Sequence, residues 1–181
     1  MKKFLALIAL SLSTSLVSFT AAAHGPSPLK VDKSVTIKAD PAKVWALVKD
    51  FGNMQKWHPA VASVKVEAKK DENGDEQTYR TLTLKSGGTI LEKFRGSDDK
   101  DMQLKYEIVS GVLPVADYTS KMTVKAGPAA GQSTVVWMGR FYRVYKLNPP
   151  IPAGQDDESA IKAVTEVYDA GLAGLKATAE K

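Results

Sequence analysis

The strongest constraint on the fold is a succession of short segments in which apolar and polar residues alternate, followed by one long helical pattern. The alternation has the two-residue period of β-strands that bury one face. Asn73-Gly74 is typical of a tight hairpin, and Gly87-Gly88 marks a second turn. Strands are therefore expected at residues 31–39, 61–68, 78–84, 89–95, 102–108, 118–126 and 133–145. Strands joined mainly by hairpins indicate an antiparallel sheet in an α+β fold.

The last segment of the chain has the helical period instead. Asp156 or Asp157 can cap its first turn, and apolar residues then recur on one face over several turns. These residues are Ile161, Val164, Tyr168, Leu172 and Leu175. A large sheet curls under its own twist, so a long helix across its concave face leaves a cavity where the two layers fail to meet. We expect the function to reside in that cavity.

A shorter helical stretch lies between the first strand and the rest of the sheet. Asp40 is expected to cap its first turn, Pro41 suits the first helical position, and Gly52 supplies a left-handed stop. The apolar stripe of this helix consists of Val44, Trp45, Leu47, Val48 and Phe51. A second turn, capped by Asn53, leads to a corner formed by Trp57-His58-Pro59. This stretch therefore predicts two short helices and a sharp corner.

The N-terminus has the pattern of a secretory signal. Two lysines precede an apolar run, and Ala21-Ala22-Ala23 resembles a cleavage site. We expect cleavage after Ala23, an extended lead-in at residues 24–30, and a single domain at residues 31–181. The apolar run falls short of the roughly 20 residues that a membrane-spanning helix needs, so we expect the mature chain to be secreted without a membrane span.

Composition argues against some classes of function. The chain contains no cysteine, which excludes disulfides and thiolate metal sites. The formal charge of +5 is spread along strands and turns, with no basic block and no interleaved aromatic residues, so we expect no nucleic-acid partner. A basic patch for an acidic protein partner is compatible with this charge.

Two histidines raise the question of a metal site. His24 would become the N-terminal residue, where its amino group and ring could chelate copper together with His58. The simpler interpretation is that His24 is only the first residue of the lead-in, because half of such a site would hang on a chain terminus. We therefore predict no metal and no cofactor.

Residues suited to catalysis are few. The chain has no Gly-x-Ser-x-Gly motif and no cysteine nucleophile. His58 and Glu92 could act as general acid and base on a bound substrate. The alternative for His58, which we adopt, is that its ring hydrogen-bonds backbone and holds the corner in shape. A buried Glu92 needs a cationic partner, and Arg80, Arg95 and Arg140 are the candidates.

Several motifs together resemble one known superfamily. They are Pro41, Val44-Trp45, Asp50-Phe51-Gly52, Trp57-His58-Pro59, Gly111 with Leu113-Pro114 and Tyr118, and Val136-Trp137. Their order is similar to that of the START-like or Bet v 1-like superfamily, the polyketide cyclase and lipid-transport group. Within it, a chain with an expected signal peptide, His24-Gly25-Pro26 and the run Lys49-Asp50-Phe51-Gly52-Asn53 most resembles the periplasmic MxaD family, accessory proteins of bacterial methanol oxidation.

The resemblance implies a helix-grip fold, in which a curved seven-stranded antiparallel sheet wraps a long C-terminal helix, with two short helices after the first strand. It also implies that apolar or amphipathic small molecules bind between sheet and helix, with loops 85–88 and 112–115 at the cavity mouth. The cavity candidates are Trp57, His58, Glu92, Tyr106, Leu113, Pro114, Tyr118 and Trp137. The pocket lysine of the plant hormone receptors in this superfamily corresponds to Ala62 here, which argues against an acidic, hormone-like ligand.

On this resemblance we expect a non-enzymatic periplasmic accessory protein, with methanol dehydrogenase and its cytochrome acceptor as partners. The main alternative is a carrier or sensor of an apolar small molecule held in the cavity. A second alternative is an enzyme similar to polyketide cyclases, acting through His58.

Overall fold

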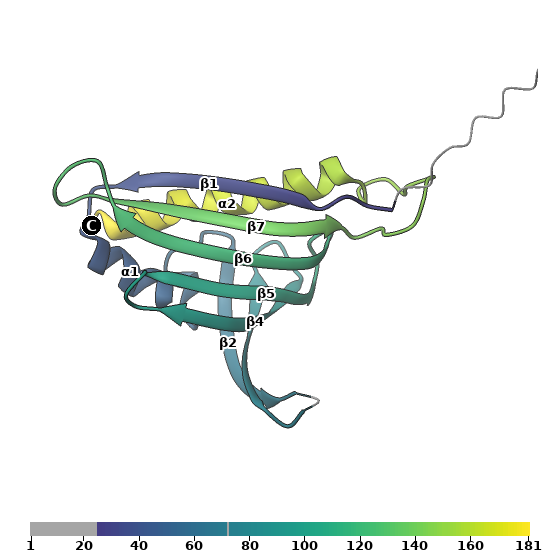
Figure 1. Ribbon diagram of the computed structural model, residues 1–181, viewed down its shortest axis with the longest axis horizontal. Helices are drawn as coiled ribbons and strands as arrows, with labels where there is room; N and C mark the ends of the chain where they lie inside the picture. Colours follow the sequence, from purple (N-terminus) through teal and green to yellow (C-terminus); the bar gives the residue numbers. More distant parts are fainter. Residues whose placement is uncertain (1–24, 72) are drawn as a thin grey trace, which may run out of the picture.

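A computed structural model describes residues 25–71 and 73–181, so the predicted signal peptide and His24 lie outside the described residues. The elements in chain order are β1 (Leu29–Ile37), α1 (Pro41–Lys49), the 3-10 helix η1 (Met54–Lys56), β2 (Val61–Lys70), β3 (Glu76–Leu84), β4 (Thr89–Asp98), β5 (Gln103–Gly111), β6 (Val115–Ala126), β7 (Ser133–Arg143) and α2 (Asp157–Ala179). The strands form one antiparallel sheet in the order β1-β7-β6-β5-β4-β3-β2. The sheet is curved, and α2 runs along its inner face against β1 and β7 (Figure 1). The predicted fold is confirmed.

The alternation of the sequence determines which side of each strand is buried. In β7, Val135, Trp137 and Phe141 are at most 1% exposed. The residues between them, such as Met138 and Arg140, point to the outer face of the sheet, because successive side chains of a strand alternate. The core therefore lies in the layer between the sheet and α2.

Helix α2 begins as predicted, and its buried face differs from the predicted apolar stripe in one residue. The Asp156 carboxylate accepts a hydrogen bond from the Ser159 backbone N–H at 2.7 Å, which caps the first turn. Ala160 is fully buried, whereas Ile161 is 39% exposed, so its predicted place on the packed face is wrong. Ala160 and Ile161 both lie about one turn before Val164, so the helical period alone does not decide which of them packs, and the structure buries Ala160. Within the described residues, no helix combines the length and apolar character needed to cross a membrane.

Helix α1 has its predicted start and a different end. Its buried residues are Val44, Trp45 and Val48, but Asp40 makes no side-chain capping hydrogen bond. The helix stops before Asp50, whose ψ of 82° leaves the helical region, and Gly52 has no left-handed φ. Gly52 is instead close to β2, since a Cβ there would lie 3.2 Å from Val66 Cγ2. The predicted left-handed stop is wrong; glycine here serves a close approach between elements.

The β2–β3 hairpin extends beyond the layer that α2 covers (Figure 1). Val66 is 46% exposed there. It lies directly opposite the buried Arg80 and therefore on the inner face of the sheet, which α2 does not cover at this point. The connection around Gly74 is also longer than a tight two-residue turn, since β2 ends at Lys70 and β3 begins at Glu76. Within it, Asp71 Oδ1 accepts hydrogen bonds from the N–H groups of Asn73 and Asp75.

Candidate functional site

A partly enclosed cavity of about 60 Å³ lies between the concave face of the sheet and α2. Apolar side chains from η1, β2, β3, β4 and β5 make most of its wall, with Val167 of α2 on the other side. Its polar wall residues are His58, Glu92, Tyr106 and Tyr118. Sites for drug-sized ligands usually measure about 300–1,000 Å³, so this cavity has room for only a few water-sized molecules.

Most of the predicted cavity candidates line this space, and two do not. His58, Glu92, Tyr106, Leu113, Tyr118 and Trp137 line the cavity. Trp57 is buried beside it, with its ring centroid 5.8 Å from that of His58 and 5.9 Å from that of Trp137. Pro114 lies in the β5–β6 loop, where its carbonyl oxygen accepts a hydrogen bond from the Val144 N–H at 3.1 Å. Whether any of these eight residues contacts a ligand stays a prediction.

The cavity is small because aromatic side chains fill the space between the layers. The rings of Trp137 and Tyr168 stack with centroids 4.3 Å apart and an angle of 14°. Two glycines permit this approach: a Cβ on Gly139 would collide with Tyr168 Oη, and a Cβ on Gly171 would lie 2.6 Å from Trp137 Cζ3. Residues with side chains at these positions would hold α2 away from the sheet.

A network of hydroxyl groups runs through this aromatic layer. Trp137 Nε1 donates to Tyr106 Oη at 3.0 Å and to Ser120 Oγ at 2.9 Å. The hydroxyl groups of Tyr118 and Tyr168 share a hydrogen bond of 2.5 Å. Burial, reinforced by the charge of Glu92, raises the pKa of Tyr106 to about 12, so the network consists of neutral O–H groups at physiological pH.

Ser120 and Tyr168 belong to this network, and neither was among the predicted cavity residues. A signal for Ser120 existed. It shares the inward face of β6 with Tyr118 and Met122, where a buried hydroxyl needs a hydrogen-bond partner. Tyr168 was predicted only as part of the apolar stripe of α2, because a helical pattern does not indicate what a tyrosine hydroxyl will meet.

Glu92 forms a buried ion pair with Arg80. The two residues lie directly opposite each other in β4 and β3, and Arg80 Nε donates to Glu92 Oε2 at 2.5 Å. Arg80 also donates to the Phe51 carbonyl oxygen at 3.0 Å, and its guanidinium lies 4.0 Å from the centre of the Phe51 ring. Burial raises the pKa of Glu92, and the guanidinium of Arg80 opposes that rise. Of the three candidate partners, Arg80 is therefore the one that neutralises Glu92.

His58 uses both ring nitrogens to hold the corner before β2. Its Nδ1 accepts a hydrogen bond from the Ala60 backbone N–H at 3.2 Å, so Nε2 carries the proton that is donated to the Val167 carbonyl oxygen at 3.1 Å. The residue is 3% exposed, and burial lowers its pKa. The ring is therefore neutral, joins the corner to α2, and hydrogen-bonds backbone as predicted.

We predict that His58 makes the protein less stable as the pH falls below 6.5, the ordinary pKa of histidine. The unfolded chain takes up a proton near that pH, whereas the folded chain does so only at lower pH, so acid favours unfolding between the two pKa values. Urea unfolding of the wild type and His58→Gln across this pH range measures the effect. The wild-type free energy of unfolding should fall more steeply on acidification than that of the variant; equal slopes would contradict the prediction.

Two loops close the end of the cavity. Leu113, in the loop between β5 and β6, lines the cavity, and the neighbouring Val112 packs on the β3–β4 turn. A Cβ on Gly88 would lie 2.5 Å from Val112 Cγ1. The turn is tied to the corner because the Lys85 N–H donates to the Ala60 carbonyl oxygen at 2.9 Å. These contacts hold the two loops together over the cavity.

The described residues give little support for metal chemistry. They contain no group of three or more histidine, aspartate or glutamate side chains that could hold a metal ion. The copper hypothesis involves His24, which lies outside them. Ala62, which was expected at the place of the receptor lysine, is exposed on β2, while Val61 beside it lines the cavity. The cavity wall at this position is therefore apolar.

Comparison with known proteins places the chain among proteins of this fold. Residues 28–180 match the family model described as "Polyketide cyclase / dehydrase and lipid transport". An uncharacterised protein from Bacillus thuringiensis has a similar crystal structure, with 29% sequence identity, a TM-score of 0.68, and coverage of 84% of this chain and 100% of that one. The Zhui aromatase/cyclase from Streptomyces sp. R1128 is similar in fold, with 16% identity, a TM-score of 0.66, and coverage of 85% and 94%.

A curated relative adds a receptor to this group. The abscisic acid receptor PYL7 from Arabidopsis thaliana is 26% identical over 150 residues, which are 80% of this chain. The match spans 65% of the receptor's own length, less than two thirds of it. The similar proteins thus include both an enzyme and a ligand receptor.

Proposed function

The chain belongs to the family described as polyketide cyclase / dehydrase and lipid transport, and from this premise we propose that it is a non-enzymatic periplasmic accessory protein of methanol oxidation. In this role it aids contact between methanol dehydrogenase and its cytochrome acceptor. The observation that supports a role outside catalysis is the small size of the cavity, about 60 Å³, because the protein's own aromatic side chains fill most of the space between the layers. A protein with so little internal space acts through its surface.

The polar groups of the cavity support the same conclusion. Glu92 is neutralised by Arg80, and both ring nitrogens of His58 bond backbone. A general acid or base must reach a proton of its substrate, and these side chains are already engaged in holding the fold. The cyclase-like alternative therefore finds no free acid–base pair in this cavity.

The methanol-oxidation setting is the part of the proposal that rests on resemblance. The predicted signal peptide, His24-Gly25-Pro26 and the run Lys49-Asp50-Phe51-Gly52-Asn53 are the features that resemble the periplasmic MxaD family. In this protein the run forms the end of α1 and the turn that leads to the corner tied to α2 by His58. The run is thus part of the framework, and the resemblance supports the family setting without identifying a partner.

We predict that a strain lacking this protein grows more slowly on methanol and transfers electrons more slowly from methanol dehydrogenase to its cytochrome. Growth on succinate, which needs no methanol dehydrogenase, is the control, and re-expression of the wild-type chain should restore methanol growth. Electron transfer is measured with the purified dehydrogenase and cytochrome, with and without the purified protein. Normal methanol growth together with an unchanged transfer rate would contradict the proposal.

A carrier or sensor of a small apolar molecule is the second candidate, and the two loops that close the cavity favour it. Opening the contact between Gly88 and Val112 would enlarge the space below Leu113. The test is extraction of protein purified from its native periplasm, followed by mass spectrometry. A defined compound in stoichiometric amount supports the carrier, and a protein free of such a compound supports the accessory role.

A further inference from the structure

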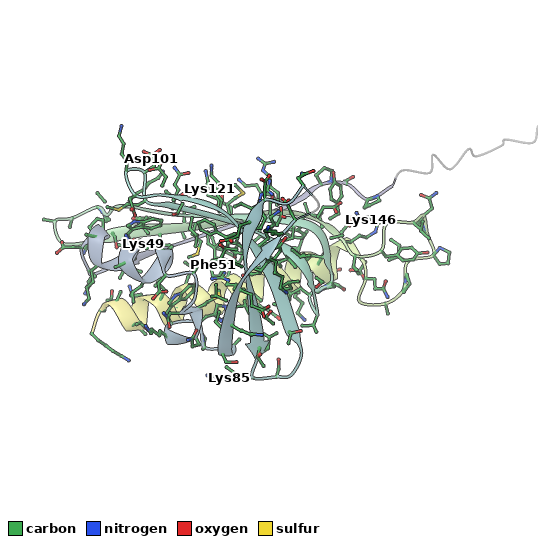
Figure 2. The ribbon with its side chains drawn as sticks, turned by 90° about the horizontal axis from the view of Figure 1, so that it is seen from below. Lys49, Phe51, Lys85, Asp101, Lys121 and Lys146 are labelled. Atoms are coloured by element: carbon green, nitrogen blue, oxygen red, sulfur yellow. The ribbon has the colours of Figure 1, made fainter. Side chains whose placement is uncertain are left out.

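The outer face of the sheet carries a group of basic side chains that the cavity does not explain. Lys105 lies between the buried residues Leu104 and Tyr106, so it points away from the core. Lys121 lies between Ser120 and Met122 and points outward for the same reason. Figure 2 shows Lys121 on the side of the sheet opposite α2.

The register brings these side chains together. Lys105 of β5 pairs directly with Lys121 of β6. The register shifts between Phe94 and Gly96, so Arg95 is the extra residue of a β-bulge in β4, and its side chain joins the same face. Arg95, Lys105, Lys121 and Met138 line an open groove of about 250 Å³, which we call the basic groove.

The charges in the basic groove are poorly balanced. Arg95 Nε lies 3.6 Å from Glu107 Oε2, which is the single carboxylate that pairs with a cation of the groove among the described residues. Neither Lys105 nor Lys121 forms an ion pair with another residue that the structure describes. Like charges directly opposite each other on two strands repel, so this pair lowers the stability of the sheet. An anion bound between the two lysines would remove the repulsion.

The rest of the molecule strengthens the contrast between its two sides. Lys93, Lys125 and Arg140 share the outer face with the basic groove by strand alternation. On the other side, the exposed surface of α2 is mixed in charge, with Glu158, Glu166 and Lys162. An acidic partner is therefore attracted to the outer face of the sheet, where the basic side chains gather.

We propose that the basic groove docks carboxylate side chains of an acidic protein partner. The partner's identity rests on the proposed accessory function, while the chemistry of the groove does not. A membrane surface fits less well, because membrane-bound faces combine basic residues with exposed large apolar ones. None of the exposed large apolar residues of the described chain lines this groove. The concave shape, with Met138 in its wall, suits an inserted side chain.

The test uses poly-L-glutamate as an acidic polypeptide, inorganic phosphate, and vesicles of phosphatidylglycerol and phosphatidylcholine. We compare the full mature protein with the double variant Lys105→Glu/Lys121→Glu and the milder Lys105→Gln/Lys121→Gln. The control is Lys43→Glu/Lys162→Glu, which changes net charge equally at exposed lysines of α1 and α2. Binding of poly-L-glutamate should weaken about tenfold in the glutamate double variant and less than about twofold in the control. Melting temperatures establish that each variant is folded.

The outcomes separate the possible occupants. Equal loss in the double variant and the control would overturn the proposal, because only net charge would then matter. Binding to vesicles without binding to poly-L-glutamate would overturn it in favour of a membrane surface, and binding to phosphate alone would leave no docking surface. These results do not depend on methanol growth, so failure of the groove and failure of the accessory function are distinguishable.

A single variant gives a readout that a structural role would not produce. Lys121→Glu places a carboxylate opposite Lys105, so the melting temperature should rise while binding of poly-L-glutamate falls. A side chain kept only for stability would show a lower melting temperature on this change. A fall in melting temperature, or unchanged binding, would contradict the assignment.

Discussion

Glu92→Ala should lower the free energy of unfolding by about 3–5 kcal/mol, because it leaves a buried guanidinium without its counter-charge. Arg80 is 3% exposed, and its remaining partners are the Phe51 carbonyl oxygen and the rings of Phe51 and Tyr106. None of them carries a negative charge. Urea unfolding at neutral pH measures the change.

Two controls make this result specific to the buried pair. The double variant Arg80→Met/Glu92→Leu removes both charges and should recover most of the lost stability, since apolar residues of similar size often replace a buried ion pair without loss. Asp32→Ala breaks the exposed pair between Lys30 and Asp32 and should change stability by less than about 1 kcal/mol. A loss as small as this in Glu92→Ala would show that the pair is not important for the fold.

Gly174→Ala should also destabilise the protein, although alanine normally favours a helix over glycine by about 1 kcal/mol. A Cβ at this position would collide with the Trp57 carbonyl oxygen and would lie 2.8 Å from Pro59 Cδ. The carbonyl belongs to the backbone of the corner, so α2 itself must move. Overpacking of this kind costs about 1–3 kcal/mol or more, which exceeds the gain in helix propensity.

Thermal unfolding measures this second effect, and the neighbouring residue offers a control. Ala173→Ser adds one atom to the exposed side of the same helix and should leave the melting temperature nearly unchanged. A higher melting temperature for Gly174→Ala would mean that the corner yields easily. The close fit between the corner and α2 would then not be a stabilising feature.

The fold was predictable because its signals are local. Alternation along the strands, the turn residues and the apolar stripe of α2 all follow from short-range geometry. Where prediction failed, the cause was a contact between elements. Gly52 was predicted as a helix stop, yet it makes room for Val66. A glycine pattern alone does not separate these two uses.

The cavity was predictable in position, and its size was not. Size depends on how closely α2 approaches the sheet, which glycines at 139, 171 and 174 control through Tyr168, Trp137 and the corner. An isolated glycine inside a strand or helix pattern indicates such an approach, so the close packing of α2 at these positions could have been predicted from the sequence. The partner of Glu92 was also open to prediction, because the turn ending at Gly88 sets the β3–β4 register that places Arg80 opposite it.

The edge position of β1 has a consequence for the order of folding. In the described sheet β1 has one neighbour, β7, and Ile37 pairs with Ser133. During synthesis, the strands β2 to β6 emerge before β7 and α2. Because β7 is the only neighbour of β1 in the described sheet, β1 stays unpaired until β7 has been made. The predicted signal peptide is separated from this late-pairing strand only by the short lead-in. An export machinery that binds the N-terminus would therefore find β1 still unpaired and accessible.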